Sequence, residues 1–323
     1  MEIVRTWSLQ VMMLMLMATG AMLKSRGILG DRDRATLTDL IMDFILPCNI
    51  INSFNVSMDM DTLKKFALLL AIAIAIQVFC YILGSVLYVN KPSEVAAIMK
   101  YCTIVSNSGF IGLPVAQGIF GAEGLMYASI FIIPQRIVIW SAGIACFTDS
   151  PSMKDVIKKV ALHPCIIAVY IGVAYMFLRE PAGALYSAYA AAPGMLVIVT
   201  DVISASVGKF VTTAASGTTA LTMILIGMML SGITPRDAAD SNVAFITVMR
   251  LILLPLLVYI CCTIAGLDPL IKGVAVVITG MPAGSTAPIL AAKYGRDYTF
   301  ASRCVVVSTV LSMISIPIWC MFL

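Results

Sequence analysis

The stretch "SNSGFIGLP", residues 106–114, decides how the whole sequence is interpreted. It lies inside a segment apolar enough to cross a membrane, yet it contains an Asn, two Ser, two Gly and a Pro. Proline removes a backbone donor and clashes with the preceding turn, and glycine tolerates the φ/ψ values of a broken helix. Because hydrocarbon cannot satisfy the freed backbone groups, a break here must be surrounded by protein or by a water-filled cavity.

The composition of the chain indicates a bilayer protein. Hydrophobic residues make up 60% of its 323 residues, charged residues 12%, and the mean hydropathy is +1.00. A spanning helix needs about 20 mostly apolar residues. We therefore expect an all-α integral membrane protein, in which even the first segment stays as an uncleaved helix. The charged residues divide the chain into ten such segments: 7–23, 40–58, 66–90, 101–122, 124–148, 160–178, 210–234, 241–267, 273–292 and 304–323.

Metal, haem and nucleic-acid chemistry have little support in the sequence. The nine Cys are scattered through or beside apolar segments, none in a CxxC pair, and the single His is His163. Structural zinc sites need about four closely spaced Cys or His ligands. We expect no cofactor, no metal and no nucleic-acid partner.

The distribution of basic residues predicts the orientation. Of the 21 Lys and Arg, thirteen are predicted on one side of the membrane and six on the other. Two more, Arg136 and Arg250, lie within spans. An excess of Lys and Arg marks the cytoplasmic side, so both termini are predicted to be extracytoplasmic, in the plasma membrane. The apolar segment 182–199 is interpreted as an interfacial or helical insertion, because an eleventh span would place the later basic residues outside. Thirteen basic residues follow the first, third, fifth, seventh and ninth segments: Lys24, Arg26, Arg32, Arg34, Lys91, Lys100, Lys154, Lys158, Lys159, Arg236, Lys293, Arg296 and Arg303.

The two halves of the chain share a pattern. "PVAQGIFGAEG" starts at Pro114 and "PILAAKYGRDY" at Pro288; in both, a glycine follows seven residues later and an acid two after that. The pattern recurs in the fourth helix of each group of five, and an odd repeat must insert upside down. We expect two inverted five-helix repeats, residues 1–148 and 161–323, joined by a cytoplasmic linker 149–160, with the insertion at about 179–203.

Both fourth helices also break before their proline. In the second, "TGMPAGSTAP" at 279–288 carries three glycine or proline positions ahead of Pro288. Each break frees the first N–H groups of a half-helix and exposes its positive end, so two such ends at midplane favour an anion. Isolated Ser in a membrane helix can instead bond its own backbone. The predicted substrate-binding residues at the breaks are Asn107, Ser108, Gly109, Pro114, Ser285, Thr286 and Pro288.

These motifs resemble the auxin efflux carrier family of the bile-acid/sodium symporter superfamily. The similarity rests on "SNSGFIGLP" and "MPAGSTAPILAAKYGRDYTFASRCVVVSTVLSMISIP" and continues in "DFILPCNII", "PQRIVIWSAGI" and "RLILLPLL". It implies broken helices four and nine that cross, export or exchange of small organic anions such as auxin, malate or malonate, and an elevator motion of helices three to five and eight to ten against one, two, six and seven. The sequence departs from the family at Ala220, where a proline is usual, and at Thr286, where Asn is common.

Helix two adds four polar residues, Asp39, Asp43, Asn49 and Asn52, and the last three have two interpretations each. Asp39 is predicted to be solvated near the cytoplasmic end. Asp43 lies deeper, where an ionisable group is costly and by default functional, so it is a candidate for a coupling proton or for an ion pair with a basic residue. Asn49 and Asn52 share a face and either line the substrate path or bond neighbouring helices.

Two arginines lie within predicted spans. Arg136, in helix five, must face a partner or a wet cavity, and either binds the substrate's carboxylate or holds an acid such as Asp43. Arg250 lies nearer the end of helix eight and is predicted to be structural.

Transport by gradients is the function that the sequence favours. It contains no P-loop or nucleotide domain, which argues against ATP-driven transport. A sodium-coupled symporter of the bile-acid type is the alternative, while a receptor, an enzyme or a channel has weaker support; Ser with one membrane-edge His makes a poor catalytic centre. The coupling ion, proton or sodium, stays open, and so does the oligomeric state, with a homodimer as one option.

Overall fold

A computed structural model describes residues 2–55, 60–147, 154, 157–158, 161–190, 195–230 and 240–323. The predicted linker 149–160 lies almost entirely outside these residues, as does the end of predicted helix seven. In the described part of the chain all named secondary-structure elements are helices, and the one pair of bridged residues belongs to no strand. The all-α prediction is confirmed.

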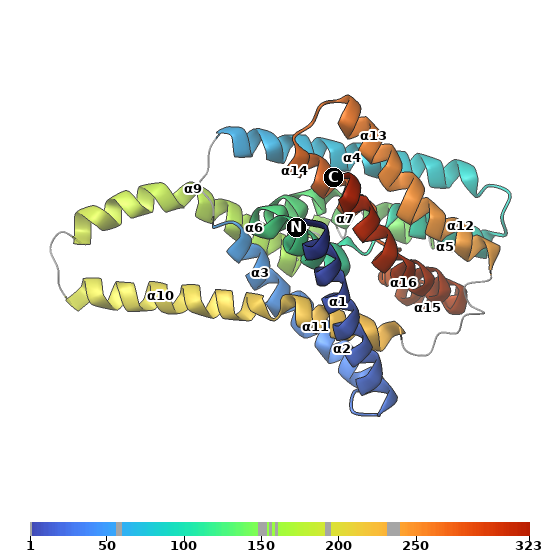
Figure 1. Ribbon diagram of the computed structural model, residues 1–323, viewed down its shortest axis with the longest axis horizontal. Coiled ribbons are helices and arrows are strands. Elements are labelled where there is room, and N and C mark those ends of the chain that lie inside the picture. The colour runs from blue at the N-terminus through green and yellow to red at the C-terminus, as the bar shows by residue number, and fades with distance from the viewer. Residues whose placement is uncertain are drawn as a thin grey trace.

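Most helices have the positions that hydropathy predicts (Figure 1). Five continuous helical segments in the described ranges are long and apolar enough to span a membrane, and three shorter ones are apolar, as expected of a membrane protein. The helices of the N-terminal half are α1 (Glu2–Ser25), α2 (Asp31–Leu40), α3 (Leu46–Ser53), α4 (Met60–Leu87), α5 (Ser93–Ile104), α6 (Leu113–Phe131) and α7 (Ile133–Val138). Those of the C-terminal half are α9 (Pro164–Ala190), α10 (Met195–Ser216), α11 (Thr218–Leu230), α12 (Ser241–Val248), α13 (Leu254–Ile264), α14 (Pro269–Thr279), α15 (Thr286–Lys293) and α16 (Tyr298–Phe322).

Widened π-helical turns stand directly before three prolines. They span Ile41–Ile45, Ser108–Gly112 and Met249–Leu253, and the prolines that follow are Pro47, Pro114 and Pro255. Proline cannot donate to the carbonyl four residues earlier and its ring clashes with that carbonyl. A π-helical turn relieves the clash without ending the helix, and such turns are frequent at functional sites.

The shared pattern of the two halves has a structural basis in its glycines. Gly121 has φ +73° and divides α6 into two parts, and Gly295 has φ +65° between α15 and α16. Both conformations are left-handed, which glycine adopts without a steric penalty. Asp297, two residues after Gly295, caps α16 by accepting a hydrogen bond from the Phe300 N–H at 2.9 Å. Each glycine therefore lets one half-helix end and the next helix begin in a new direction.

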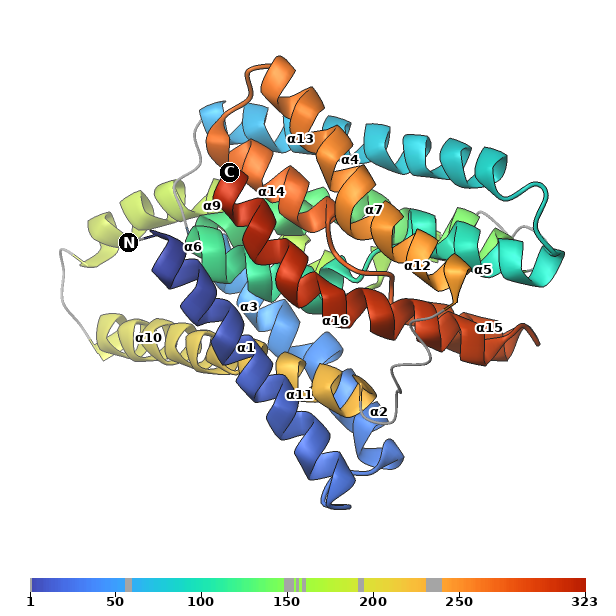
Figure 2. The same ribbon diagram turned by 45° about the vertical axis from the view of Figure 1, so that its right-hand side comes forward.

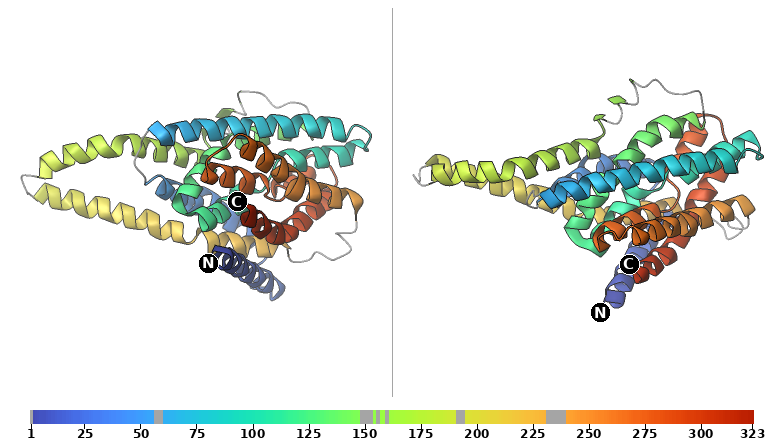
Figure 3. Two further views of the ribbon diagram at one scale, coloured as in Figure 1. Left: turned by 45° about the horizontal axis from the view of Figure 1, so that its top comes forward. Right: turned by 90° about the horizontal axis from the view of Figure 1, so that it is seen from above.

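The predicted apolar insertion, 182–199, is helical throughout its described residues. These residues extend α9 to Ala190 and begin α10 at Met195, ahead of the predicted start of helix seven at Phe210. The two helices run outward from the rest of the protein (Figures 1 and 3). At the other end, α10 passes into α11 through a turn at Gly217, and both α9 and α10 pack against α3.

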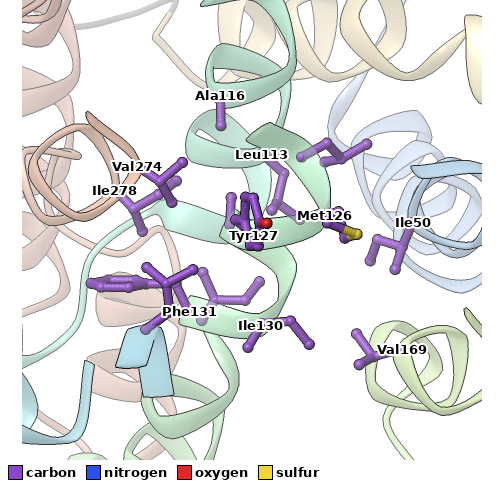
Figure 4. Packing of buried hydrophobic residues seen from close by; sticks show 14 of the residues in the cluster. Ile50, Leu113, Ala116, Met126, Tyr127, Ile130, Phe131, Val169, Val274 and Ile278 are labelled. Carbon is purple, nitrogen blue, oxygen red and sulfur yellow. The ribbon is translucent and has the colours of Figure 1, made fainter. Parts of the chain in front are cut away.

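The largest buried cluster is built around α6. Its side chains, among them Tyr127 and Leu113, pack between α14 and the pair α3 and α9 (Figure 4). Elsewhere α1 packs closely on α11, where Gly20 and Gly227 lie against the partner helix's backbone (Figure 2). Small residues at such contacts let membrane helices approach, since burial from lipid gives little hydrophobic gain.

The packing sorts the helices into two groups. One contains α1, α2, α3, α9, α10 and α11; the other contains α4 to α7 and α12 to α16. The groups meet where α3 contacts α6 and where α1 contacts α16. The boundary between them contains the site described next.

Candidate functional site

The two broken helices cross at their interruptions. The chain leaves α5 at Ile104 and resumes a helical path at Ser108, and it leaves α14 at Thr279 and resumes at Thr286. Between them, Asn107 N–H donates to the Pro282 carbonyl at 2.8 Å, and Gly284 N–H donates to the Val105 carbonyl at 3.0 Å. These bonds form one antiparallel bridge. Both predicted breaks, and their crossing, are confirmed.

A cavity of about 390 Å³ lies beside the crossing, at the boundary of the two helix groups. One wall comes from α2, the turn after it, α11 and His163. The other comes from the crossing, α7 and α15. The lining residues are Arg34, Thr38, Asp39, Met42, Ser106, Asn107, Ser108, Gly109, Phe110, Ile132, Gln135, Arg136, Ile139, Trp140, His163, Leu225, Ile226, Gly284, Ser285, Thr286 and Ile289.

Both half-helix N-termini contribute to this cavity. Asn107, Ser108 and Gly109 begin the second half of the first broken helix, and Ser285 and Thr286 begin α15. The N–H groups in a helix's first turn have no intrahelical acceptor, and each N-terminus carries about half a positive charge. Two such ends at one cavity amount to about one positive charge in the backbone alone.

Arg136 adds a full positive charge to the same cavity. Its side chain is 7% exposed, and Nη1 lies 2.8 Å from His163 Nε2. His163 Nδ1 in turn lies 3.2 Å from the Cys165 backbone nitrogen. The other terminal nitrogen, Nη2, is buried against Gly109 without a hydrogen-bond partner among the described residues. The structure thus pairs Arg136 with His163, and with no acid in the described chain.

Gln135 fixes the extended backbone at the first break. Its Nε2 donates to the Ser106 carbonyl at 2.7 Å, and the Ser106 hydroxyl donates to Gln135 Oε1 at 2.8 Å. A buried carbonyl in an extended stretch would otherwise lose a hydrogen bond at a cost of about 1–3 kcal/mol. Neither Gln135 nor His163 was predicted to be a site residue; the one available signal in the sequence was that Gln135 stands between Pro134 and Arg136.

Several predicted site residues lie outside the cavity. Pro114 and Pro288 are buried in the first turns of the half-helices, where they shape the backbone. Asn49 and Gln117 exchange two amide hydrogen bonds, at 2.9 and 3.2 Å, and Asn52 accepts from the Thr212 hydroxyl at 3.3 Å. These contacts join neighbouring helices, which is one of the two interpretations predicted for Asn49 and Asn52; the other was that they line the substrate path.

The two aspartates of helix two occupy different places. Asp39 lines the cavity and is exposed, as its solvated interpretation requires. Asp43 is also exposed and does not line the cavity. The predicted ion pair between Asp43 and Arg136 is absent within the described residues. The role of Asp43 as a proton carrier stays a prediction.

Known proteins match nearly the whole chain. The sequence profile of the family described as membrane transport protein matches residues 6–159 and 150–320. The chain belongs to this family of membrane transport proteins. The resemblance to the auxin efflux carriers is thereby confirmed.

Relatives of this transporter include archaeal and bacterial proteins. An "Uncharacterized transporter" of Methanothermobacter thermautotrophicus is 25% identical over 316 residues, which cover 95% of this chain and 94% of the relative. An "Uncharacterized transporter" of Methanocaldococcus jannaschii is 21% identical and covers 96% of each chain. A "Putative malonate transporter" of Rhizobium meliloti is 22% identical over 262 residues, 74% of this chain and 71% of that one.

Proposed function

We propose that this transporter is a secondary carrier that exports or exchanges small organic anions. One observation carries the proposal: two half-helix N-termini and the guanidinium of Arg136 converge on one cavity. Together they supply about two positive charges. The one acid that lines the cavity, Asp39, is exposed and belongs to the opposite wall. Such a site favours a carboxylate over a cation or a neutral solute.

Arg136 is the proposed ligand for the carboxylate. A guanidinium presents its N–H groups as a planar fork that matches the two oxygens of a carboxylate. Here one arm is occupied by His163 and the other, Nη2, has no hydrogen-bond partner in the part of the chain that the structure describes. An anion that bonds the second arm would satisfy a buried donor whose desolvation costs about 1–3 kcal/mol.

The remaining lining favours a compact body attached to the carboxylate. Apolar side chains make up much of the wall, including Met42, Phe110, Ile132, Trp140 and Ile289. An auxin-like anion, with an aromatic ring and one carboxylate, suits these walls, and a malate- or malonate-like dicarboxylate suits the positive charge. The name of the Rhizobium meliloti relative supports the second class.

An elevator motion is the proposed mechanism. The cavity lies between two helix groups, so a displacement of one group past the other can expose it to each side of the membrane in turn. The polar contacts across the boundary include those of Arg136 with His163 and of Asn49 with Gln117. We propose that α4 to α7 and α12 to α16 move as a unit past the other helices, and that these contacts break in the motion. The matched glycines at 121 and 295 support two inverted five-helix repeats.

Counterflow in proteoliposomes tests the proposal. The purified transporter is reconstituted with one unlabelled mono- or dicarboxylate inside, and entry of the same labelled anion is measured. We expect accumulation with at least one anion and none with matched cations or sugars. Heat-inactivated protein and an Arg136→Met variant serve as controls. Equal accumulation of anions and neutral solutes by the wild type, or no accumulation of any carboxylate in either orientation, would remove the proposed function.

A further inference from the structure

A second arginine lies on the other side of the crossing. Arg250 is 2% exposed, and all its hydrogen bonds within the described residues go to backbone carbonyls. Nη1 donates to Thr103 at 3.0 Å, and Nη2 donates to Thr279 at 3.0 Å and to Met281 at 3.1 Å; Nε also reaches Met281, at 3.3 Å. Its partners therefore come from both broken helices.

These carbonyls mark the negative ends of the two first halves. Thr103 is in the last turn of α5, Thr279 is the last residue of α14, and Met281 lies in the second interruption. Each helix C-terminus carries about half a negative charge, so two of them sum to about one. The single charge of a guanidinium balances this sum. In carriers with broken helices, such C-terminal ends and unwound carbonyls are where a coupling cation binds.

Local structure explains how Arg250 reaches the crossing. It lies in the π-helical turn Met249–Leu253 ahead of Pro255. Proline at 255 cannot donate to the Leu251 carbonyl, and Trp319 Nε1 donates to that carbonyl instead, at 2.8 Å. The predicted structural role of Arg250 agrees with these contacts, but the side chain is buried and does not reach toward the helix end.

We propose that Arg250 is a built-in counter-ion that occupies the place of a coupling cation. A sodium ion bound at the same carbonyls would add a second positive charge to that of Arg250, while the two helix C-termini supply only about one negative charge. The carrier therefore moves its anion with no sodium ion bound at the crossing. This inference rests on the proposed function and specifies its coupling, against the sodium-coupled alternative.

Thermal unfolding of purified protein tests the site without any substrate. We compare the wild type, Arg250→Ala and Arg32→Ala, an exposed arginine of α2, in sodium chloride and in N-methylglucamine chloride of equal ionic strength. The wild-type Tm should be the same in both salts. Arg250→Ala should lower Tm by about 5 °C or more, since several buried charge-assisted bonds are lost. Methylguanidinium should restore part of this loss saturably and leave Arg32→Ala unchanged.

Three results would overturn the inference: a saturable rise of the wild-type Tm with sodium, an Arg250→Ala variant as stable as the wild type, or no difference between the two variants in methylguanidinium. Should Arg250→Ala fail to fold, Arg250→Lys replaces it, and its Tm should lie below that of the wild type and be insensitive to sodium; stabilisation of this variant by sodium would contradict the inference.

A transport measurement separates this inference from the proposed function. The anion found by counterflow is assayed with and without sodium on both sides, and equal rates support Arg250 as the counter-ion. A sodium-dependent rate would refute it while leaving anion transport intact. If no anion is transported, the proposed function fails, and the unfolding measurements still decide whether the crossing holds a metal ion.

Discussion

At the first interruption, residues 105–107, Ser106 bonds Gln135 but Asn107 lines the cavity close to the cation Arg136, whereas at the second, residues 280–286, several polar groups are bonded to neighbouring helices. Asn107 makes no side-chain hydrogen bond in the described part of the chain, and Arg136 lies beside it. At the second break the Thr286 hydroxyl bonds the Tyr101 hydroxyl at 2.6 Å, and Ala283 N–H donates to Ser308 Oγ at 3.1 Å.

This difference suggests that the two helix breaks have different roles: the first binds the substrate and the second stabilises the crossing. Both breaks supply a positive helix end and a cavity-lining polar side chain, Asn107 or Ser285, but the first also has the guanidinium of Arg136 against its half-helix at Gly109. The second is held in place by its neighbours, Arg250 included. We therefore expect changes at the first break to reduce transport at nearly constant stability, and changes at the second to reduce stability more than transport.

The largest effect is expected for Arg136→Met. Losing a buried charged partner of a carboxylate costs about 3 kcal/mol or more, so counterflow should fall by at least about 100-fold. Tm should change little, since one arm of the guanidinium has no partner to lose. Arg136→Lys keeps the charge but not the fork, and should recover only part of the rate. Wild-type counterflow by the Met variant would show that the substrate binds elsewhere.

Asn107→Ala is expected to reduce counterflow by about 10- to 100-fold, because a hydrogen bond to a charged group contributes about 1.5–3 kcal/mol. The protein should stay folded and inserted, with Tm close to that of the wild type. Ser285→Ala, at the equivalent place in the second break, is the matched variant and should lose much less. Equal losses in the two variants would contradict the asymmetry between the breaks.

Gly109→Ala tests how closely Arg136 must approach the first half-helix. A Cβ at this position would lie 3.0 Å from Arg136 Nη2, so the guanidinium has to move away. We expect counterflow to fall by about 10-fold, since a displacement of this size weakens a positioned contact. Gly208→Ala is the control: its Cβ would meet no atom within 4 Å, and it should leave transport intact. An unaffected Gly109→Ala carrier would mean that Arg136 does not bind from its present position.

Much of the crossing could be predicted, because its determinants are local. The glycines and prolines clustered at 107–114 and 280–288 weaken a helix locally, and the repeated glycines at 121 and 295 mark where direction changes. The position of Arg136 in the middle of a span already required a partner or a cavity.

The remaining features depend on which helices meet, and sequence spacing carries little information about that. His163 reaches Arg136 across the boundary between the helix groups, from the start of a different helix. Asn49 could equally have faced the cavity or a neighbouring helix, and Gln117 decides the matter in this structure. Hydropathy alone also could not distinguish an interfacial insertion from extensions of α9 and α10, because both are apolar and helical.

Asp43→Asn separates anion binding from coupling. Asp43 lies in the π-helical turn before Pro47, outside the cavity lining, so its loss should leave counterflow at constant pH nearly unchanged. If the carboxylate carries the coupling proton, uptake driven by a pH gradient should become independent of that gradient in the variant. Asp39→Asn, one turn earlier and at the cavity, provides the comparison. If gradient-driven uptake is unchanged in Asp43→Asn, then Asp43 does not carry the coupling proton.

The smallest effect is expected at the hydroxyl pair of the second break. Tyr101→Phe removes the 2.6 Å bond to Thr286, which should lower the free energy of unfolding by about 1 kcal/mol. Thr286→Val should have a similar effect, and the double variant should lose clearly less than the sum, because both changes remove the same bond. Counterflow should stay within about threefold of the wild type, since a stabilising bond of this size lies outside the anion's proposed ligands. A Tyr101→Phe carrier that keeps its Tm but loses transport would place Thr286 among the substrate's ligands and make the two breaks equal partners in recognition.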